Sequence, residues 1–149
     1  MKILYITSVF PRPEESSTIY SDFAETLRDE GHEVTVVMGE GKKKLKQTSW
    51  FNERGLKVLR VRIRDYYDVG IFQKGVAFLT FKWSLEKAIR KNLKSLSFDI
   101  ILFEAPPLTM AGPVSFAMRL FKCPSYLMLK DIFPQNALDL EFITKYNPI

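Results

Sequence analysis

The sequence predicts an α/β fold with a doubly wound, mostly parallel sheet and helices on both faces, for three reasons. Short runs of strand-forming apolar residues alternate along the chain with longer segments of helical period. Two of these runs, residues 3–6 and 100–103, are continuously apolar, which is typical of strands buried on both faces. The chain has 149 residues, of which 46% are apolar, and this is enough for one domain with a full core.

The first part of the chain predicts one complete strand–helix–strand unit. Residues 3–9 are expected to form the central strand, and residues 17–30 a helix with one apolar stripe. Gly31 follows the last helical turn and is expected to end the helix, since glycine readily adopts the left-handed conformation needed there. The alternating pattern of residues 34–38 predicts a second strand, parallel to the first because such crossovers are right-handed.

The remaining elements extend this unit. A polar connector over residues 39–54 is expected to lead to a strand over 56–63, whose interleaved charges indicate an exposed face or an edge position. Further along the chain, the pattern predicts a helix over 71–96, a strand over 99–103, a helix over 109–122 and a strand over 125–129. This order predicts a Rossmann-like sheet of at least five strands, with ligands expected at its carboxyl edge.

Composition restricts the compartment and the partners. A single cysteine, Cys123, excludes a disulfide framework, and we expect no signal peptide and no membrane-spanning helix, so a cytoplasmic location is predicted. The net charge is +5, but residues 42–94 carry 15 basic and 4 acidic side chains. Such a basic segment indicates either an anionic partner or a solvated face of lysines.

Three stretches stand out in the same order as they occur in one enzyme family. They are Lys2-Ile-Leu-Tyr-Ile-Thr with Phe10-Pro11 and Gly31-His32-Glu33-Val34, then Asp99-Ile-Ile-Leu with Ala105-Pro106-Pro107-Leu108, and finally Lys130-Asp131-Ile132-Phe133-Pro134-Gln135-Asn136-Ala137. Together they resemble the amino-terminal half of GT-B-fold retaining glycosyltransferases of the bacterial capsule and exopolysaccharide type, a family 4-like group. The family usually carries a Gly-Gly pair in the loop where this chain has Ser16-Ser17.

The resemblance implies that residues 1–149 are a truncated, acceptor-binding Rossmann-like domain. The carboxy-terminal domain, which holds the nucleotide sugar in this family, is then absent. The implied substrates are a nucleotide-diphosphate sugar donor and a sugar or lipid-linked acceptor, and no cofactor and no metal are expected. We expect the full-length protein to transfer hexosyl groups with retention in polysaccharide or glycolipid synthesis, and residues 1–149 alone to be inactive.

Candidate phosphate ligands lie in the loop after the first strand. Sugar transfer builds negative charge on the departing diphosphate, and the free N–H groups of a helix that begins near Ser17 favour an anion. Arg12, Ser16 and Ser17 are therefore candidate substrate-binding residues, with Arg12 adding a charge-assisted contact. In the alternative interpretation, residues 16–18 only cap the helix, and capping by Ser16, Ser17 or Thr18 explains these residues without a ligand.

Candidate acceptor-binding residues follow two later strands. Asp131 comes directly after a strand and matches the third motif, so it is the candidate catalytic residue, orienting an acceptor hydroxyl or taking its proton. In the alternative interpretation, Asp131 caps the turn before Pro134. Its neighbour Lys130 is a candidate phosphate ligand or a partner of Asp131. Glu104 is a candidate for binding sugar hydroxyls, and a salt bridge is its alternative role.

The basic segment leads to a hypothesis of membrane docking through residues 71–94. In it, aromatic side chains insert at the interface while lysines contact anionic headgroups, which places the protein peripherally at the inner face of the membrane. The residues concerned are Phe72, Phe78, Phe81 and Trp83, with Lys74, Lys82, Lys87 and Lys91. In the rival interpretation, the aromatic side chains belong to the core and the lysines face water.

Two other interpretations concern nucleic acid and binding without catalysis. We expect no nucleic-acid partner, because no recognised module or stacking sheet accompanies the charge. The alternative to an enzyme part is a stand-alone module that binds a nucleotide or phosphorylated ligand, or a basic membrane-surface domain, without catalysis.

Overall fold

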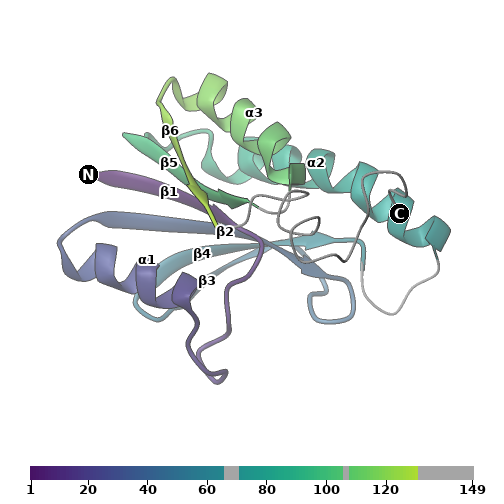
Figure 1. The fold of residues 1–149 in the computed structure, drawn as a ribbon, viewed down its shortest axis with the longest axis horizontal. Helices are drawn as coiled ribbons and strands as arrows, with labels where there is room; N and C mark the ends of the chain where they lie inside the picture. Colours follow the sequence, from purple (N-terminus) through teal and green to yellow (C-terminus); the bar gives the residue numbers. More distant parts are fainter. Residues whose placement is uncertain (66–70, 106–107, 131–149) are drawn as a thin grey trace, which may run out of the picture.

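The computed structural model describes residues 1–65, 71–105 and 108–130, and for residues 71–79 and 108 it describes the backbone alone. The elements in chain order are β1 (Lys2–Thr7), α1 (Ile19–Asp29), β2 (Glu33–Gly41), β3 (Ser49–Glu53), β4 (Leu56–Ile63), α2 (Ile71–Leu93), β5 (Ile100–Ala105), the 3-10 helix η1 (Leu108–Met110), α3 (Ala111–Phe121) and β6 (Ser125–Leu129). They form a mixed α/β fold in which α1 covers one face of a sheet and α2 and α3 cover the other (Figure 1).

The sheet has six strands in the order β3-β4-β2-β1-β5-β6, with β1 near its centre. All neighbouring strands are parallel except β3 and β4, so the prediction of a mostly parallel sheet is confirmed. From β1 the chain first adds β2 and β4 on one side, and then β5 and β6 on the other. The carboxyl ends of β1 and β5 therefore lie side by side where the direction of strand addition reverses, and ligands of open α/β sheets bind at such a point.

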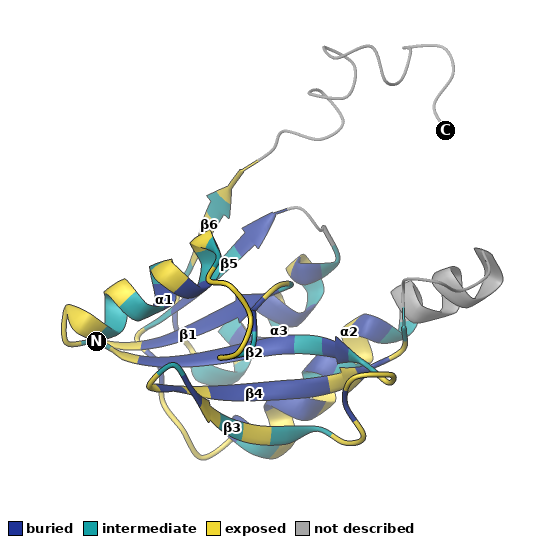
Figure 2. Cartoon of the chain, turned by 90° about the horizontal axis from the view of Figure 1, so that it is seen from below, coloured by how far each residue is buried: buried dark blue, intermediate teal, exposed yellow. Residues whose placement is uncertain are grey.

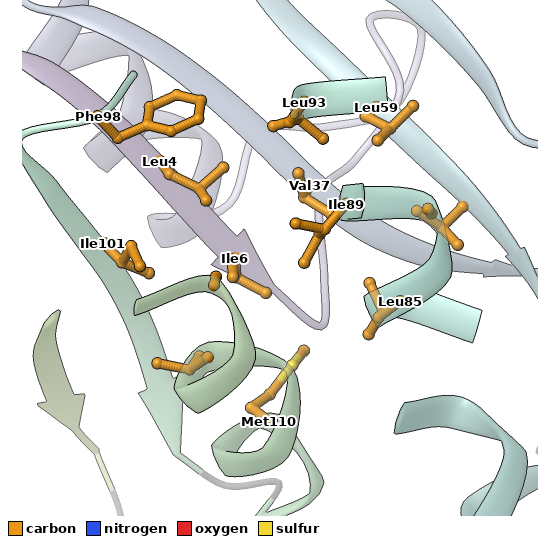
Figure 3. Close-up of a cluster of buried hydrophobic side chains, with 14 of the residues drawn as sticks. Leu4, Ile6, Val37, Leu59, Leu85, Ile89, Leu93, Phe98, Ile101 and Met110 are labelled. Carbon is orange, nitrogen blue, oxygen red and sulfur yellow. The ribbon is translucent and has the colours of Figure 1, made fainter. Parts of the chain in front are cut away.

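The apolar run of β1 contributes to two cores because successive side chains of a strand point to opposite faces. Ile3 and Tyr5 belong to the core under α1, whereas Leu4 and Ile6 belong to the larger core under α2 and α3. Figure 3 shows the larger core, where leucine and isoleucine side chains from the sheet meet those of α2. The central strands are accordingly buried along most of their length (Figure 2), as expected of strands covered on both faces.

The segment between β2 and β4 contains a strand that was not predicted. The prediction of a purely polar connector over residues 39–54 was wrong, because β3 pairs antiparallel with β4. For the same reason β4 is not at an edge, and its Arg60 is only 1% exposed. The predicted edge position of this strand is therefore wrong, and its charges do not all lie on an exposed face.

Arg60 is held in the interior by two carboxylates and a carbonyl. Its guanidinium donates to Glu53 at 2.6, 2.9 and 3.1 Å, and to the carbonyl oxygen of Phe10 at 3.2 Å. Glu40 lies 3.6 Å from Arg60 and also pairs with Arg12 at 3.0 Å. Since a buried guanidinium is tolerated only when it is paired and hydrogen-bonded, these contacts explain its burial.

Arg54 connects the hairpin of β3 and β4 to the loop that follows β1. Arg54 and Gly55 both have positive φ, of 52° and 73°, as two-residue hairpin turns of type I′ require. The Arg54 side chain donates to the carbonyl oxygens of Arg12 at 3.1 Å and Glu15 at 2.8 Å, and it pairs with Glu25 at 3.2 Å. These bonds hold a non-glycine residue in a conformation that few side chains adopt.

Helix α1 begins at Ile19, slightly later than predicted, because Thr18 is its N-cap. Thr18 and Ser21 form a capping box, in which each side chain accepts a bond from the other's backbone N–H. At the other end Gly31 has a φ of 83° and the N–H of His32 donates to the carbonyl oxygen of Leu27, so the predicted glycine stop is confirmed.

Replacing Thr18 by alanine is expected to lower the free energy of unfolding by about 1 kcal/mol, because one orphan N–H of the first turn loses its acceptor. Urea denaturation followed by circular dichroism measures the change. Thr26→Ala is the matched control, since Thr26 is exposed on the same helix and its hydroxyl only bonds back to the helix carbonyl of Asp22. Equal losses for the two variants would contradict the capping role.

A helix that crosses a bilayer needs about 20 consecutive, mostly apolar residues. Within the described residues, no helix combines the length and the apolar character needed to cross a membrane.

Candidate functional site

A buried carboxylate occupies the point between the carboxyl ends of β1 and β5. Glu104, the penultimate residue of β5, is 1% exposed. It accepts hydrogen bonds from the Thr7 hydroxyl, from the Tyr5 hydroxyl at 3.3 Å and from the Ser8 N–H at 3.3 Å. Lys130 completes the set with an ion pair of 2.9 Å. We call Tyr5, Thr7, Glu104 and Lys130 the Glu104 cluster.

Lys130 brings the end of β6 and the beginning of α1 to the same place. Its side chain is 30% exposed, and its ammonium lies 3.4 Å from the ring centroid of Tyr20, the second residue of α1. Its backbone N–H donates to the carbonyl oxygen of Ala105 at 3.2 Å, which fixes the residue beside the end of β5. The cluster therefore joins the ends of three strands to the first turn of a helix.

The Tyr5 hydroxyl is a donor in this cluster rather than an anion. Burial in the core, and next the negative charge of Glu104, raise the pKa of Tyr5 far above its ordinary value. The phenol therefore remains protonated throughout the physiological range and donates to the carboxylate.

This shift predicts a loss of stability in alkaline solution. Tyr5 ionises in the unfolded chain near pH 10 but at higher pH in the folded chain, so its contribution is complete below about pH 10 and is lost as pH rises above it. In urea denaturation between pH 8 and 11, the Tyr5→Phe variant is expected to decline less steeply than the unsubstituted protein. At pH 8 it should be less stable by about 1 kcal/mol, the net value of one hydrogen bond. Parallel pH curves would contradict the assignment.

The cluster determines what chemistry the site can perform. An ammonium has three N–H donors. Lys130 directs one of them to Glu104, and the structure gives the other two no acceptor within residues 1–65, 71–105 and 108–130. Glu104 is already bonded to four donors, so its main effect is to hold Lys130 at the rim. The arrangement suits binding of a hydroxyl or a phosphate oxygen by Lys130.

The structure brings together two of the residues that the sequence singled out. Glu104 and Lys130 form an ion pair, which is the alternative role considered for Glu104. Ser16 and Ser17 are exposed in the loop before α1, and of the three predicted cap residues it is Thr18 that caps the helix.

Arg12, another predicted substrate-binding residue, makes its contacts away from this pair. The Arg12 side chain pairs with Glu40 at 3.0 Å and lies over the ring of Phe51, at 5.9 Å from its centroid. An anion at Arg12 therefore has to compete with a carboxylate. Asp131, the predicted catalytic residue, lies outside the described residues.

Sequence reasoning missed Tyr5, Thr7 and Tyr20 as members of this site. Tyr5 and Thr7 are two positions apart on β1 and therefore point to the same face. That alternation could have indicated that the two hydroxyl groups lie together, but Tyr5 fits equally well as one residue of the apolar run. Among the described residues, no three His, Cys, Asp or Glu side chains are placed to hold a metal ion.

Fold and site together define an α/β protein with a polar cluster at the carboxyl edge of its sheet. No protein-family model matches the chain, and no curated protein matches it. Two solved structures that are similar to it are both of the C-terminal domain of a hydrogenase from Pyrococcus furiosus. One has a TM-score of 0.58 and 11% identity over 85% of this chain and 89% of that chain. The other has a TM-score of 0.57 and 13% identity over 85% and 90%. At this identity the similarity concerns the fold alone.

Proposed function

We propose that this chain is the acceptor-binding half of a retaining, nucleotide-sugar-dependent glycosyltransferase with a doubly wound, Rossmann-like sheet. One observation carries the proposal: Glu104 and Lys130, which follow two different strands, meet at the place where the direction of strand addition reverses. The second and third motifs of the family resemblance supply these two residues or their neighbours. The order β4-β2-β1-β5-β6 and the helices on both faces support the Rossmann-like assignment.

In this proposal Lys130 binds a polar group of the acceptor. Glu104 positions the ammonium, and Tyr5 and Thr7 in turn position Glu104 through their hydroxyl donors. Asp131 follows Lys130 directly in the sequence and is proposed to orient the acceptor hydroxyl or to take its proton. The N–H groups at the start of α1, near Tyr20, are proposed to favour the departing phosphates.

A donor domain outside residues 1–149 is part of the proposal, because the resemblance assigns the nucleotide sugar to that domain. Residues 1–149 are therefore expected to bind an acceptor without catalysing transfer. Transfer of labelled hexose from a panel of nucleotide sugars to a bacterial lipid extract tests this point. Turnover by residues 1–149 alone would contradict the assignment of donor binding to a separate domain.

Binding to the chain itself is tested by nuclear magnetic resonance. A short-chain polyprenyl diphosphate carrying one N-acetylhexosamine serves as the acceptor probe, and uridine diphosphate as the nucleotide probe. The acceptor probe is expected to shift the amide signals of Ser8, Tyr20 and Lys130, and the Lys130→Gln variant to weaken its binding at least tenfold. Lys122→Gln is the matched control, because Lys122 is exposed at the opposite edge of the sheet.

A stand-alone binding module is the second candidate, because the two Lys130 donors that find no acceptor among the described residues equally suit a phosphate. In the same titration, this function requires that uridine diphosphate alone shifts the signals around Lys130. If the acceptor probe leaves them unchanged while the nucleotide shifts them, the binding module replaces the glycosyltransferase proposal.

A further inference from the structure

A basic recess lies at the carboxyl end of β4, beside the middle of α2. It is an open hollow of about 340 Å³ between the loop after β2, the last residues of β4 and the middle of α2. Its lining consists of Lys42, Arg62, Ile63, Arg64, Thr80, Trp83, Ser84 and Lys87. None of these residues belongs to the Glu104 cluster.

The four basic residues that line the recess form no ion pair with any carboxylate that the structure describes. Lys42, Arg62, Arg64 and Lys87 are all exposed, and none of them forms an ion pair within the part of the chain that the structure describes. Arg60 on the same strand behaves differently, since it is bonded to carboxylates. Four like charges around one hollow repel each other, and an anion in the hollow relieves that repulsion.

Trp83 adds an apolar side chain to this basic surface. It is 63% exposed, whereas Leu85 and Ile89, on another face of α2, are completely buried. Phe81, which was predicted to insert into the membrane, is 5% exposed and belongs to the core, so that part of the docking hypothesis was wrong. The side chains of Phe72, Phe78 and Lys74 lie outside the described part of the structure.

Exposed cations continue beyond the recess in two directions. Along the loop after β2 they are Lys43, Lys44 and Lys46, and along α2 they are Lys82, Arg90 and Lys91, with Lys94 directly after the helix. Lys82 has a neighbouring carboxylate, Glu86, at 3.9 Å. A positive surface that extends over a loop, a strand end and a helix suits a plane of many negative charges better than a single small ligand.

We propose that the recess binds phosphate groups of anionic lipid headgroups, with Trp83 entering the membrane interface. Tryptophan is favoured at such interfaces because its ring is apolar while its N–H is polar. The guanidinium groups of Arg62 and Arg64 match the geometry of phosphate oxygens, and the hydroxyl of Ser84 is a further donor in the lining. This docking does not depend on the proposed enzymatic function, since it uses other residues.

Vesicle co-sedimentation tests the proposal. The purified chain is mixed with vesicles of phosphatidylcholine alone, or of phosphatidylcholine with about 30 mol% phosphatidylglycerol. The salt concentration is about 0.1 M, at which the Debye length is about 10 Å. Binding is expected with the anionic vesicles only. The triple variant Arg62→Gln, Arg64→Gln, Lys87→Gln is expected to bind about 100-fold more weakly, because each cation near such a surface contributes about fivefold.

A second triple variant removes the same charge from the opposite edge of the sheet. Lys2, Lys57 and Lys122 are exposed at the amino ends of β1 and β4 and just before β6, and their replacement by glutamine is expected to leave vesicle binding unchanged. Equal weakening by both triple variants would mean that net charge alone attracts the chain, and would overturn the recess as a site. Urea denaturation of both variants verifies that they fold.

Fluorescence of Trp83 separates a membrane from a free phosphate. Trp50→Phe leaves Trp83 as the one tryptophan, and its emission is expected to shift to shorter wavelength with anionic vesicles and to be quenched by brominated lipid. Inorganic phosphate at millimolar concentration is expected to cause neither effect. If anionic vesicles leave the emission unchanged, or phosphate abolishes sedimentation at constant ionic strength, the docking proposal is wrong.

Discussion

Replacing Arg60 by methionine is expected to lower the free energy of unfolding by about 3–5 kcal/mol, the usual cost of removing one partner from a buried ion pair. Without the guanidinium, Glu53 and Glu40 remain as two carboxylates that are only 5% and 6% exposed. The carbonyl oxygen of Phe10 also loses its donor. Urea denaturation at pH 7 measures the loss.

Two further variants separate the ion pair from packing. Arg62→Met removes an exposed arginine two positions further along β4 and is expected to change stability by less than about 0.5 kcal/mol. The double variant Arg60→Met, Glu53→Gln removes a charge from each side and should recover part of the loss. If the effects of Arg60→Met and Glu53→Gln simply add in the double variant, the two residues are not coupled. Pairing with Glu53 would then not explain why Arg60 is tolerated in the interior.

Replacing Lys130 by methionine is expected to lower the free energy of unfolding by about 2 kcal/mol, in the range of hydrogen bonds to charged groups. The Glu104 carboxylate is 1% exposed, and among the described residues only neutral donors would remain bonded to it. The effect should be smaller than that of Arg60→Met, because the Lys130 side chain is 30% exposed and water can partly replace it. Thermal or urea denaturation at pH 7 provides the measurement.

The matching double variant combines Lys130→Met with Glu104→Gln. A glutamine oxygen still accepts from Thr7 and Tyr5 but carries no charge that needs a cation. The double variant is therefore expected to be more stable than Lys130→Met alone. A double variant that is equally or less stable would show that Lys130 contributes through its cation–π contact with Tyr20 rather than through its pairing with Glu104.

The order of most elements could be predicted because their signals are local. The run of residues 3–6 predicts a strand covered on both faces, and β1 indeed supplies both cores. The helical stripe of α1 and the glycine that ends it depend only on neighbouring residues. Strand β3 could not be predicted in this way, since Trp50 and Phe51 stand in a polar segment and pairing with β4 determines their conformation.

Burial of charge was the other limit of sequence reasoning. Arg60 alternates with apolar residues like any exposed arginine of a half-buried strand. It is buried because Glu40 comes from β2 and Glu53 from β3, and only the folded sheet brings those carboxylates together. Arg12, predicted to meet an anion from solution, finds one inside the protein instead.

The candidate site was predicted in part because strand ends are easy to locate. Glu104 and Lys130 each stand at the end of an apolar run, and parallel strands deliver their ends to one edge. Their mutual contact depends on β5 and β6 being neighbours in register, which the sequence does not state. Tyr5 and Thr7 were hidden because hydroxyl-bearing residues at the end of a buried strand look like core.

The Arg54 side chain makes two distant stretches of the chain depend on each other. It holds the carbonyl oxygens of Arg12 and Glu15, so the course of the loop in front of α1 is set by a turn about 40 residues later. Grafting that loop onto another sheet would therefore fail unless the β3–β4 hairpin were transplanted with it. Substitutions at the turn should therefore change the conformation of the loop that leads into α1.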